Sequence, residues 1–79
     1  LDTDTPWTVV AIDDPINTIP YVILTLQKIF GFSLEEATNK TMEIHNDGRS
    51  ALWAGARTQA ENYRNRVLAA QINCKVEQI

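Results

Sequence analysis

Hydrophobic and polar residues follow one another with a period that changes along the chain, and the changes mark out the elements of secondary structure. Residues 7–12 form a short run rich in β-branched side chains, which is typical of a buried strand. Over residues 19–30 apolar side chains recur every three or four positions, which predicts a helix with Thr25 off its apolar stripe. Gly31 is expected to end this helix in the left-handed conformation.

A second helix is predicted to begin directly afterwards. Ser33 and Glu36 have the spacing of a capping box, and Asn46-Asp47-Gly48 carries the signals of a helix end. His45 therefore falls in the last turn, on the buried or groove-facing side, whereas Lys40 and Glu43 fall outside that side. The whole predicted inward face is Leu34, Ala37, Thr38, Thr41, Ile44 and His45.

The second half of the chain repeats the change of period. Residues 49–55 are expected to form a strand, although their alternation of polar and apolar side chains is weak. Thr58 and Glu61 have the spacing of another capping box, so a third helix is predicted from there. Its inward stripe is Ala60, Tyr63, Val67 and Ala70. Ile72, Cys74 and Val76 then alternate with polar residues and predict a third strand with one solvated face.

The predicted element order, β-α-α-β-α-β, indicates a single small α+β domain. We expect a three-stranded, mostly antiparallel sheet packed against the helices. With 79 residues, 44% of them hydrophobic, the chain has material for one modest core. Residues 1–6 are interpreted as the remnant of an N-terminal tail, and residues 7–79 as the core domain.

The stretch Asp13-Asp14-Pro15-Ile16-Asn17-Thr18 joins the first strand to the first helix and holds the densest polar chemistry. Asp and Asn close turns on their own backbone, and Pro15 fixes its φ angle. Asn17 stands where an N-cap is expected, with Pro20 tolerated in the first turn. The two carboxylates of this turn have a structural explanation, as caps of a helix N-terminus, beside a functional one.

Charge and composition exclude several classes of protein. A net charge of −3 and a pI of about 4.9, with scattered basic residues, argue against binding of nucleic acid. No apolar run reaches the length of a membrane span, so we expect a soluble protein. A single cysteine, Cys74, excludes an internal disulfide and fits a reducing compartment, and one His with one Cys predicts no metal site.

Two kinds of chemistry remain open to the polar residues. An enzyme would have to use Asp13, Asp14 and His45, with Cys74 as nucleophile, but no phosphate loop or metal spacing accompanies them. A binding site fits better, because acceptors beside apolar side chains suit a cation attached to a hydrophobic group. A peptide α-amine followed by an apolar side chain has that form, which composition and spacing permit without selecting it.

Several ordered motifs together resemble the ClpS family, whose members deliver N-degron substrates to the Clp protease. The resemblance covers about residues 7–77 and implies an adaptor rather than an enzyme, without cofactors, monomeric, and located in the cytoplasm or the plastid stroma. The implied partners are N-degron proteins with a hydrophobic N-terminal residue and the N-domain of a Clp AAA+ unfoldase. The motifs are Val9-Val10-Ala11-Ile12-Asp13-Asp14-Pro15-Ile16-Asn17-Thr18, Gln27-Lys28-Ile29-Phe30-Gly31-Phe32, Ala37-Thr38 and Ile44-His45-Asn46-Asp47-Gly48-Arg49.

The same resemblance implies which residues of this chain bind the substrate. The amine-binding positions fall on Asp13, Asp14, Asn17 and His45. The hydrophobic pocket falls on Ile19, Val22, Thr41, Ile44 and Ile72. This chain departs from the family in having Asp13, Pro15 and Thr41 where Asn, an acidic residue and Met are frequent, and in a shorter third helix. From Thr41 and Ile19 we expect Leu to be favoured among Leu, Phe, Tyr and Trp.

Two other readings remain. One is a protein-interaction domain of similar fold, such as the C-terminal domain of a stalk protein, which does not recognise N-degrons. The other is a small hydrolase. In the first, the Asp-Asp turn and His45 would have no joint role, and in the second Cys74 would have to be accessible and activated.

Overall fold

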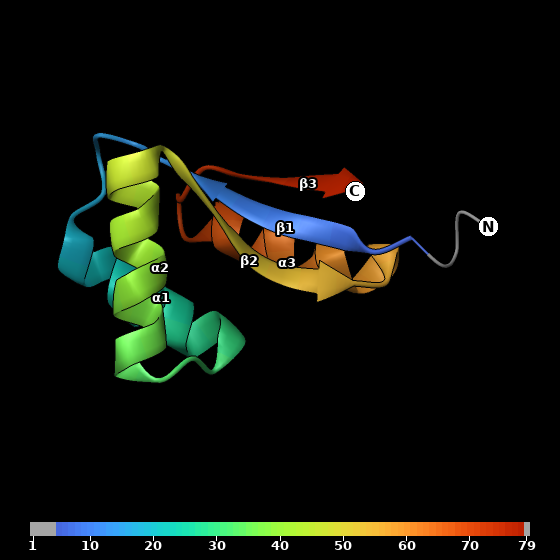
Figure 1. Cartoon of the computed structure of the whole chain (residues 1–79), viewed down its shortest axis with the longest axis horizontal. Coiled ribbons are helices and arrows are strands. Elements are labelled where there is room, and N and C mark those ends of the chain that lie inside the picture. Colours follow the sequence, from blue (N-terminus) through green and yellow to red (C-terminus); the bar gives the residue numbers. More distant parts are fainter. Residues whose placement is uncertain (1–4, 79) are drawn as a thin grey trace.

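The computed structural model describes residues 5–78, so residues 1–4 of the predicted tail and residue 79 lie outside the described part. The order β-α-α-β-α-β and the antiparallel sheet, with strand order β2-β1-β3, confirm the predicted fold class. Figure 1 shows α3 lying along one face of the sheet and α1 and α2 beside the end where β1 stops and β2 starts. The elements are β1 (Trp7–Ile12), α1 (Ile19–Phe30), α2 (Leu34–Asp47), β2 (Arg49–Gly55), α3 (Arg57–Ala69) and β3 (Cys74–Gln78).

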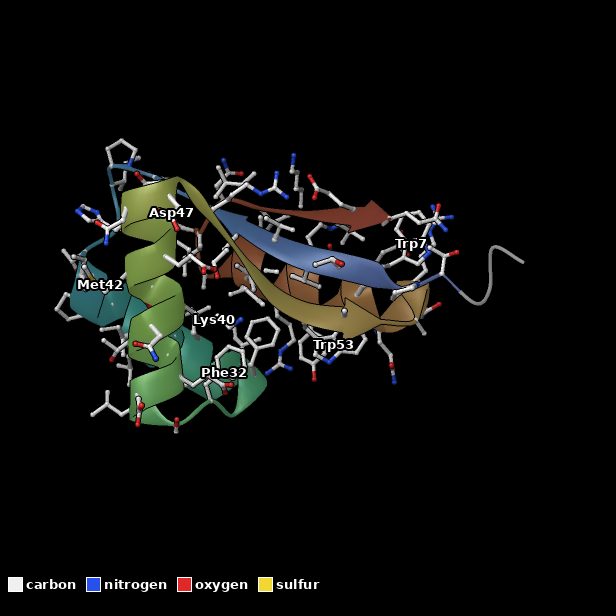
Figure 2. The ribbon with its side chains drawn as sticks, in the orientation of Figure 1. Trp7, Phe32, Lys40, Met42, Asp47 and Trp53 are labelled. Atoms are coloured by element: carbon white, nitrogen blue, oxygen red, sulfur yellow. The ribbon has the colours of Figure 1, made fainter. Side chains whose placement is uncertain are left out.

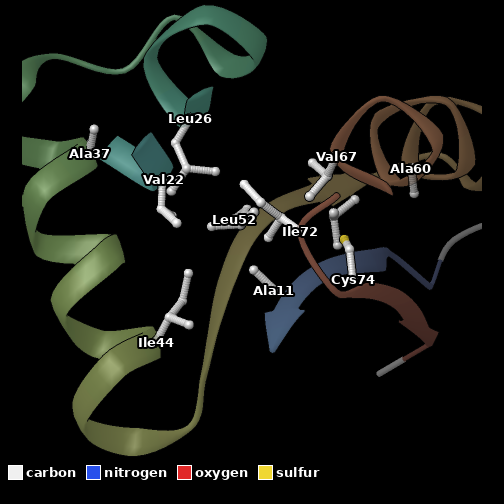
Figure 3. Packing of buried hydrophobic residues seen from close by; sticks show 11 residues of the cluster. Ala11, Val22, Leu26, Ala37, Ile44, Leu52, Ala60, Val67, Ile72 and Cys74 are labelled. Atoms are coloured by element: carbon white, nitrogen blue, oxygen red, sulfur yellow. The ribbon is translucent and has the colours of Figure 1, made fainter. Parts of the chain in front are cut away.

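The core lies between the sheet and the helices, and β1 is its centre because it is paired on both sides. Val9 and Ala11 project from β1 into the core and are fully buried, as are Ala60 and Val67 of α3 and Leu26 of α1. Figure 3 shows side chains from α1, α2, α3 and all three strands meeting there. The small alanines allow α3 to lie close to the sheet.

A β-bulge explains why the alternation in residues 49–55 is weak. The register between β1 and β2 shifts between Val9 and Val10, which pair with Trp53 and Ala51, so Leu52 is an extra residue on β2. Because an extra residue interrupts the strict alternation of faces, the pattern of a regular strand is lost in the sequence. Leu52 is buried in the core, two residues after the buried Ser50.

The predicted helix ends are confirmed at Gly31, Gly48 and Ser33. Gly31 and Gly48 end α1 and α2 with φ angles of 73° and 89°, and the Ser33 hydroxyl accepts a hydrogen bond from the Glu36 amide at 3.1 Å. The predicted cap at Asn17 is wrong, because Thr18 caps α1 by accepting from the Tyr21 amide.

The predicted capping box at Thr58 is also wrong. Helix α3 begins at Arg57, and its N-cap, Ala56, makes no side-chain cap hydrogen bond. Thr58 is therefore already inside the helix, and Glu61 pairs with Arg57 at 3.3 Å instead of reaching back to a cap. An i,i+4 ion pair replaces the expected capping box.

Three predicted faces or bounds need correction. Thr25 is buried, because α1 packs against α3 as well as α2 and so buries more than one stripe. Leu34 is 63% exposed, since the first turn of α2 lies at the end of that helix away from the sheet (Figure 1). Strand β3 begins at Cys74 rather than Ile72, because the Ile72 amide is still bonded to the carbonyl of Val67 in α3.

Polar side chains outside the predicted inward face of α2 dock that helix on β2. Lys40 Nζ donates to the carbonyl oxygen of Ala51 at 2.8 Å, and Ser50, which is buried, donates to the carboxylate of Glu43. Figure 2 shows Lys40 on the side of α2 that faces the strands and Met42 on the opposite side. These bonds fix the end of α2, and with it His45, relative to the sheet.

Candidate functional site

A cavity of about 280 Å³ lies where the polar turn, the start of α1, the end of α2 and Ile72 of the connection between α3 and β3 come together. Every residue predicted for the amine site or the hydrophobic pocket lines it, although these residues come from four separate parts of the chain. The lining consists of Ile12, Asp13, Asp14, Pro15, Asn17, Ile19, Val22, Thr41, Ile44, His45 and Ile72.

The turn over residues 13–17 is held by hydrogen bonds of its own and by one to Gly48, the C-cap of α2. The Asp13 amide donates to the carbonyl of Gly48 at 2.9 Å, which fixes the turn to the end of α2. Asp13 Oδ1 accepts from the Asp14 amide at 3.0 Å, and Asp14 Oδ1 accepts from the Ile16 amide at 2.8 Å. Each carboxylate thus uses one oxygen to shape the turn, and its second oxygen can accept from a ligand.

Asn17 connects the turn to the chain that enters β3. Its Nδ2 donates to the carbonyl oxygen of Gln71 at 2.7 Å. This hydrogen bond directs the side chain of Asn17 toward Gln71, and Thr18, the residue directly before α1, is the cap. The amide oxygen of Asn17 is left as an acceptor beside the two carboxylates.

The inner wall of the cavity is apolar. Thr41 belongs to it despite its hydroxyl, because Thr41 Oγ1 donates to the carbonyl of Ala37 at 2.7 Å and so has its polarity satisfied within α2. The side chains that form this wall are buried: Val22, Thr41, Ile44 and Ile72. A ligand side chain in this cavity would meet hydrocarbon on the inside and polar groups at the turn and at His45.

His45 and Ile19 lie at the rim rather than in the wall. His45 lines the cavity from the last turn of α2 but is exposed, so of the two predicted placements, buried or facing a groove, the second is right. Ile19, the first residue of α1, is half-buried. A neutral imidazole offers one acceptor nitrogen, which adds to the acceptors of the turn.

Other chemistry is less well supported by the described residues. Burial raises the pKa of the Cys74 thiol to about 11, although the charge of Arg64 and a backbone hydrogen bond lower it in part. A thiol with that pKa is almost wholly protonated near neutral pH, and the thiolate is the nucleophilic form. Within residues 5–78, no three His, Cys, Asp or Glu side chains are grouped so that they could hold a metal ion, and no helix is long and apolar enough to cross a membrane.

Comparison with known proteins identifies the family. The family model described as ATP-dependent Clp protease adaptor protein ClpS matches residues 2–75. This chain belongs to the ClpS family. The sequence resemblance on which the candidate site was built is thereby confirmed at the level of the family.

Individual ClpS proteins differ from this chain in length. It is 39% identical over 67 residues to the ATP-dependent Clp protease adapter protein ClpS of Rhodococcus jostii (strain RHA1). The aligned region covers 85% of this chain and 60% of that protein. It is 36% identical over 76 residues to the ClpS of Mycobacterium marinum, covering 96% and 75%. The chain thus spans about three fifths of the length of the Rhodococcus relative.

A solved ClpS structure has the same fold. The structure of Agrobacterium tumefaciens ClpS2 bound to L-phenylalaninamide superposes with a TM-score of 0.88 at 16% sequence identity, covering 95% of this chain and 98% of that one. At this sequence identity the match supports the fold of this chain and not the roles of its individual site residues.

Some residues at this ClpS-family site were not predicted from the sequence. Ile12 and Pro15 line the cavity, and their position on either side of Asp13 and Asp14 is a signal that could have found them. Gln71 holds Asn17 through its backbone carbonyl. A carbonyl acceptor leaves no trace in the residue type, so nothing in the sequence pointed to Gln71.

Proposed function

We propose that this chain is an adaptor that binds the free N-terminal residue of N-degron proteins in the 280 Å³ cavity. The α-ammonium is bound by Asp13, Asp14, Asn17 and His45, and the side chain enters the pocket of Ile19, Val22, Thr41, Ile44 and Ile72. The observation that carries the proposal is the pair of carboxylates at the edge of an otherwise apolar cavity. An N-terminal residue presents this combination, a cation one atom away from an apolar side chain.

The physical reason for amine recognition is desolvation. An ammonium group that leaves water needs acceptors in its place, and charge-assisted hydrogen bonds to carboxylates are stronger than neutral ones. The second oxygens of Asp13 and Asp14 and the amide oxygen of Asn17 supply such acceptors. Supporting this proposal, the Agrobacterium relative of the same fold is bound to L-phenylalaninamide, an amino-acid amide with an apolar side chain.

We further propose that the pocket prefers Leu to the wide aromatic side chains Phe, Tyr and Trp. Thr41 directs its hydroxyl to Ala37 and leaves a short side chain toward the cavity. Ile19 at the rim is β-branched and stiff at χ1, so it adapts poorly to an indole ring. Both features suit a compact aliphatic residue.

The proposed partners follow from the family. Bound substrates would be passed to the N-domain of a Clp AAA+ unfoldase in the cytoplasm or plastid stroma, with the adaptor acting as a monomer. The site has a binding role and no catalytic one in this proposal, since the thiol of Cys74 is buried and protonated.

The test is a fluorescence titration with two copies of one peptide that begins with Leu, one with a free amine and one N-acetylated. We expect acetylation to weaken binding at least about tenfold, which corresponds to about 1.4 kcal/mol. A third peptide with a free N-terminal Gly separates the amine contribution from the pocket contribution. Equal binding of the free and acetylated Leu peptides would favour an interaction domain that does not recognise N-degrons.

A further inference from the structure

The four residues that connect α3 to β3 contribute Ile72 to the lining of the cavity, and their backbone is unusual. The Gln71 and Ile72 amides donate to the carbonyls of Leu68 and Val67, which is the hydrogen-bond pattern of a Schellman motif. The residue in the left-handed position of this motif is Gln71, with φ 66°. Among the described residues it is the one non-glycine residue with a positive φ, in a place where glycine is usual.

Three of the four carbonyls of this strained connection accept hydrogen bonds from other parts of the chain. The carbonyl of Ala70 accepts from the Tyr21 hydroxyl at 2.7 Å, and that of Gln71 accepts from Asn17 Nδ2 at 2.7 Å. The carbonyl of Asn73 accepts from the Ile12 amide at 2.9 Å. The donors belong to β1, to the polar turn itself and to α1, so the connection is fixed to the elements on which the proposed amine site is built.

Ile72 lies between these bonds and is the residue that the connection contributes to the cavity. It is 3% exposed and lines the cavity, yet it is outside β3 and is not positioned by strand pairing. Its place therefore depends on the Schellman motif before it and on the hydrogen bonds at Ala70, Gln71 and Asn73. A strained residue held by such bonds is a reason to look for a functional role.

We propose that Tyr21 is a positioning residue which, together with Asn17, sets the width of the side-chain pocket by holding Ile72 against it. The inference rests on the proposed function and says how the pocket selects its substrate. The position of Ile72 favours N-terminal residues with a compact aliphatic side chain. With both bonds in place, the wall is fixed and a wide side chain is rejected. Without them, Ile72 moves outward, the pocket accepts a wide side chain more readily, and Leu loses close contacts.

A change at Tyr21 can test the positioning role without altering the lining of the pocket. Its hydroxyl bonds to Ala70, but its side chain is 42% exposed and does not line the cavity. Tyr21→Phe removes one oxygen and no pocket contact. The matched control is Tyr63→Phe, the same change in the other tyrosine of the chain, whose ring stacks on Phe30 at a centroid distance of 4.8 Å.

Two measurements are made on each variant. The first is hydrogen exchange of the Gln71 and Ile72 amides, which requires no ligand. In Tyr21→Phe we expect these amides to exchange about threefold or more faster, because local opening no longer has to break the hydrogen bond to Ala70. In Tyr63→Phe we expect no change in the exchange rate. The second is the ratio of the dissociation constants of free-amine Trp and Leu peptides. We expect it to fall about threefold or more in Tyr21→Phe alone.

The outcomes distinguish the two proposals. Unchanged exchange in Tyr21→Phe, or faster exchange with an unchanged Trp-to-Leu ratio, overturns the positioning role, since a purely structural bond would alter stability but not selectivity. If the native chain binds neither peptide, the proposed function has failed, and with it the role of Tyr21 in selectivity. Faster exchange in that case would show only that the hydroxyl anchors the connection.

Discussion

The side-chain amide of Asn17 donates a hydrogen bond of 2.7 Å to the carbonyl oxygen of Gln71, 54 positions further along the chain. A carbonyl accepts and never donates, so the orientation of the Asn17 amide is fixed by its partner. The nitrogen faces Gln71, and the oxygen remains available to a ligand. One side chain thus joins two parts of the proposed site and still has an acceptor for an amine.

Asn17→Asp should therefore lower the stability of the folded protein, although it adds a negative charge beside a proposed cation site. The new carboxylate would place an acceptor against the acceptor of Gln71, and we expect a loss of about 1 kcal/mol in the free energy of unfolding. Asn17→Ala is the control, since it removes the hydrogen bond without the repulsion and should cost less. Urea unfolding measures both, and an Asp variant as stable as the native chain would contradict the assigned orientation.

His45→Ala should weaken peptide binding with little effect on folding. The side chain is exposed at the rim of the cavity, so its removal leaves no buried void. An amine that loses one of its acceptors should bind about 1 to 3 kcal/mol more weakly. Thermal unfolding and peptide titration are measured together, with Asn46→Ala, the exposed next residue, as control. A large fall in thermal stability with unchanged affinity would make His45 a structural residue.

The features that could be predicted from the sequence are those decided within a few residues. Gly31, Gly48 and Ser33 end or begin helices through contacts to their own turn, and the change of hydrophobic period located each element. The site residues could be proposed because a run of family motifs carries them. The structure then brings these residues to one cavity.

The errors arose where a distant partner decided the outcome. Asn17 has the chemistry of an N-cap, but its side chain is directed toward Gln71, and Thr18 caps α1. Leu52 is displaced by a bulge that depends on pairing with β1, so residues 49–55 showed little alternation. Neither of these partners is visible in the local sequence.

A cluster of charged side chains on the sheet should make the stability of the folded protein fall at acid pH. Hydrogen bonds from Arg49 and then Lys75 lower the pKa of the Glu77 carboxyl to about 2. Because the folded-state pKa lies below the ordinary value, the stabilisation is present above about pH 4.3 and is lost as the pH falls toward 2.

The change is measured as the thermal midpoint between about pH 5 and pH 2, where Glu77→Gln should show a shallower fall than the native chain. Glu61→Gln, which removes the same charge from the pair with Arg57, is the control. The group is exposed to solvent, so the difference should shrink at about 1 M salt. Parallel curves for the native chain and Glu77→Gln would show that this cluster contributes nothing to acid stability.

Thr41 provides the sharpest test of side-chain selection. Its hydroxyl is bonded to Ala37, so only a short side chain is left toward the cavity. We expect N-terminal Leu to bind at least as well as Phe and better than Trp, and Ile and Val to be tolerated more than the family norm suggests. The differences should be small, since one methylene in a pocket is worth about 1 to 3 kcal/mol.

Thr41→Met changes both the shape and the flexibility of the wall. The thioether is longer than the Thr side chain and can adjust its conformation to a flat ring, so the variant should lose tolerance for Ile and Val and improve its relative binding of Phe and Trp. A competition series of Leu, Ile, Val, Phe, Tyr and Trp peptides on both chains gives the ranking directly. Thr41→Val is the matched control, because it keeps the volume and the β-branch and removes only the hydroxyl that faces Ala37. If Trp binds best to the native chain, or if Thr41→Met leaves the ranking unchanged, Thr41 does not select the substrate side chain.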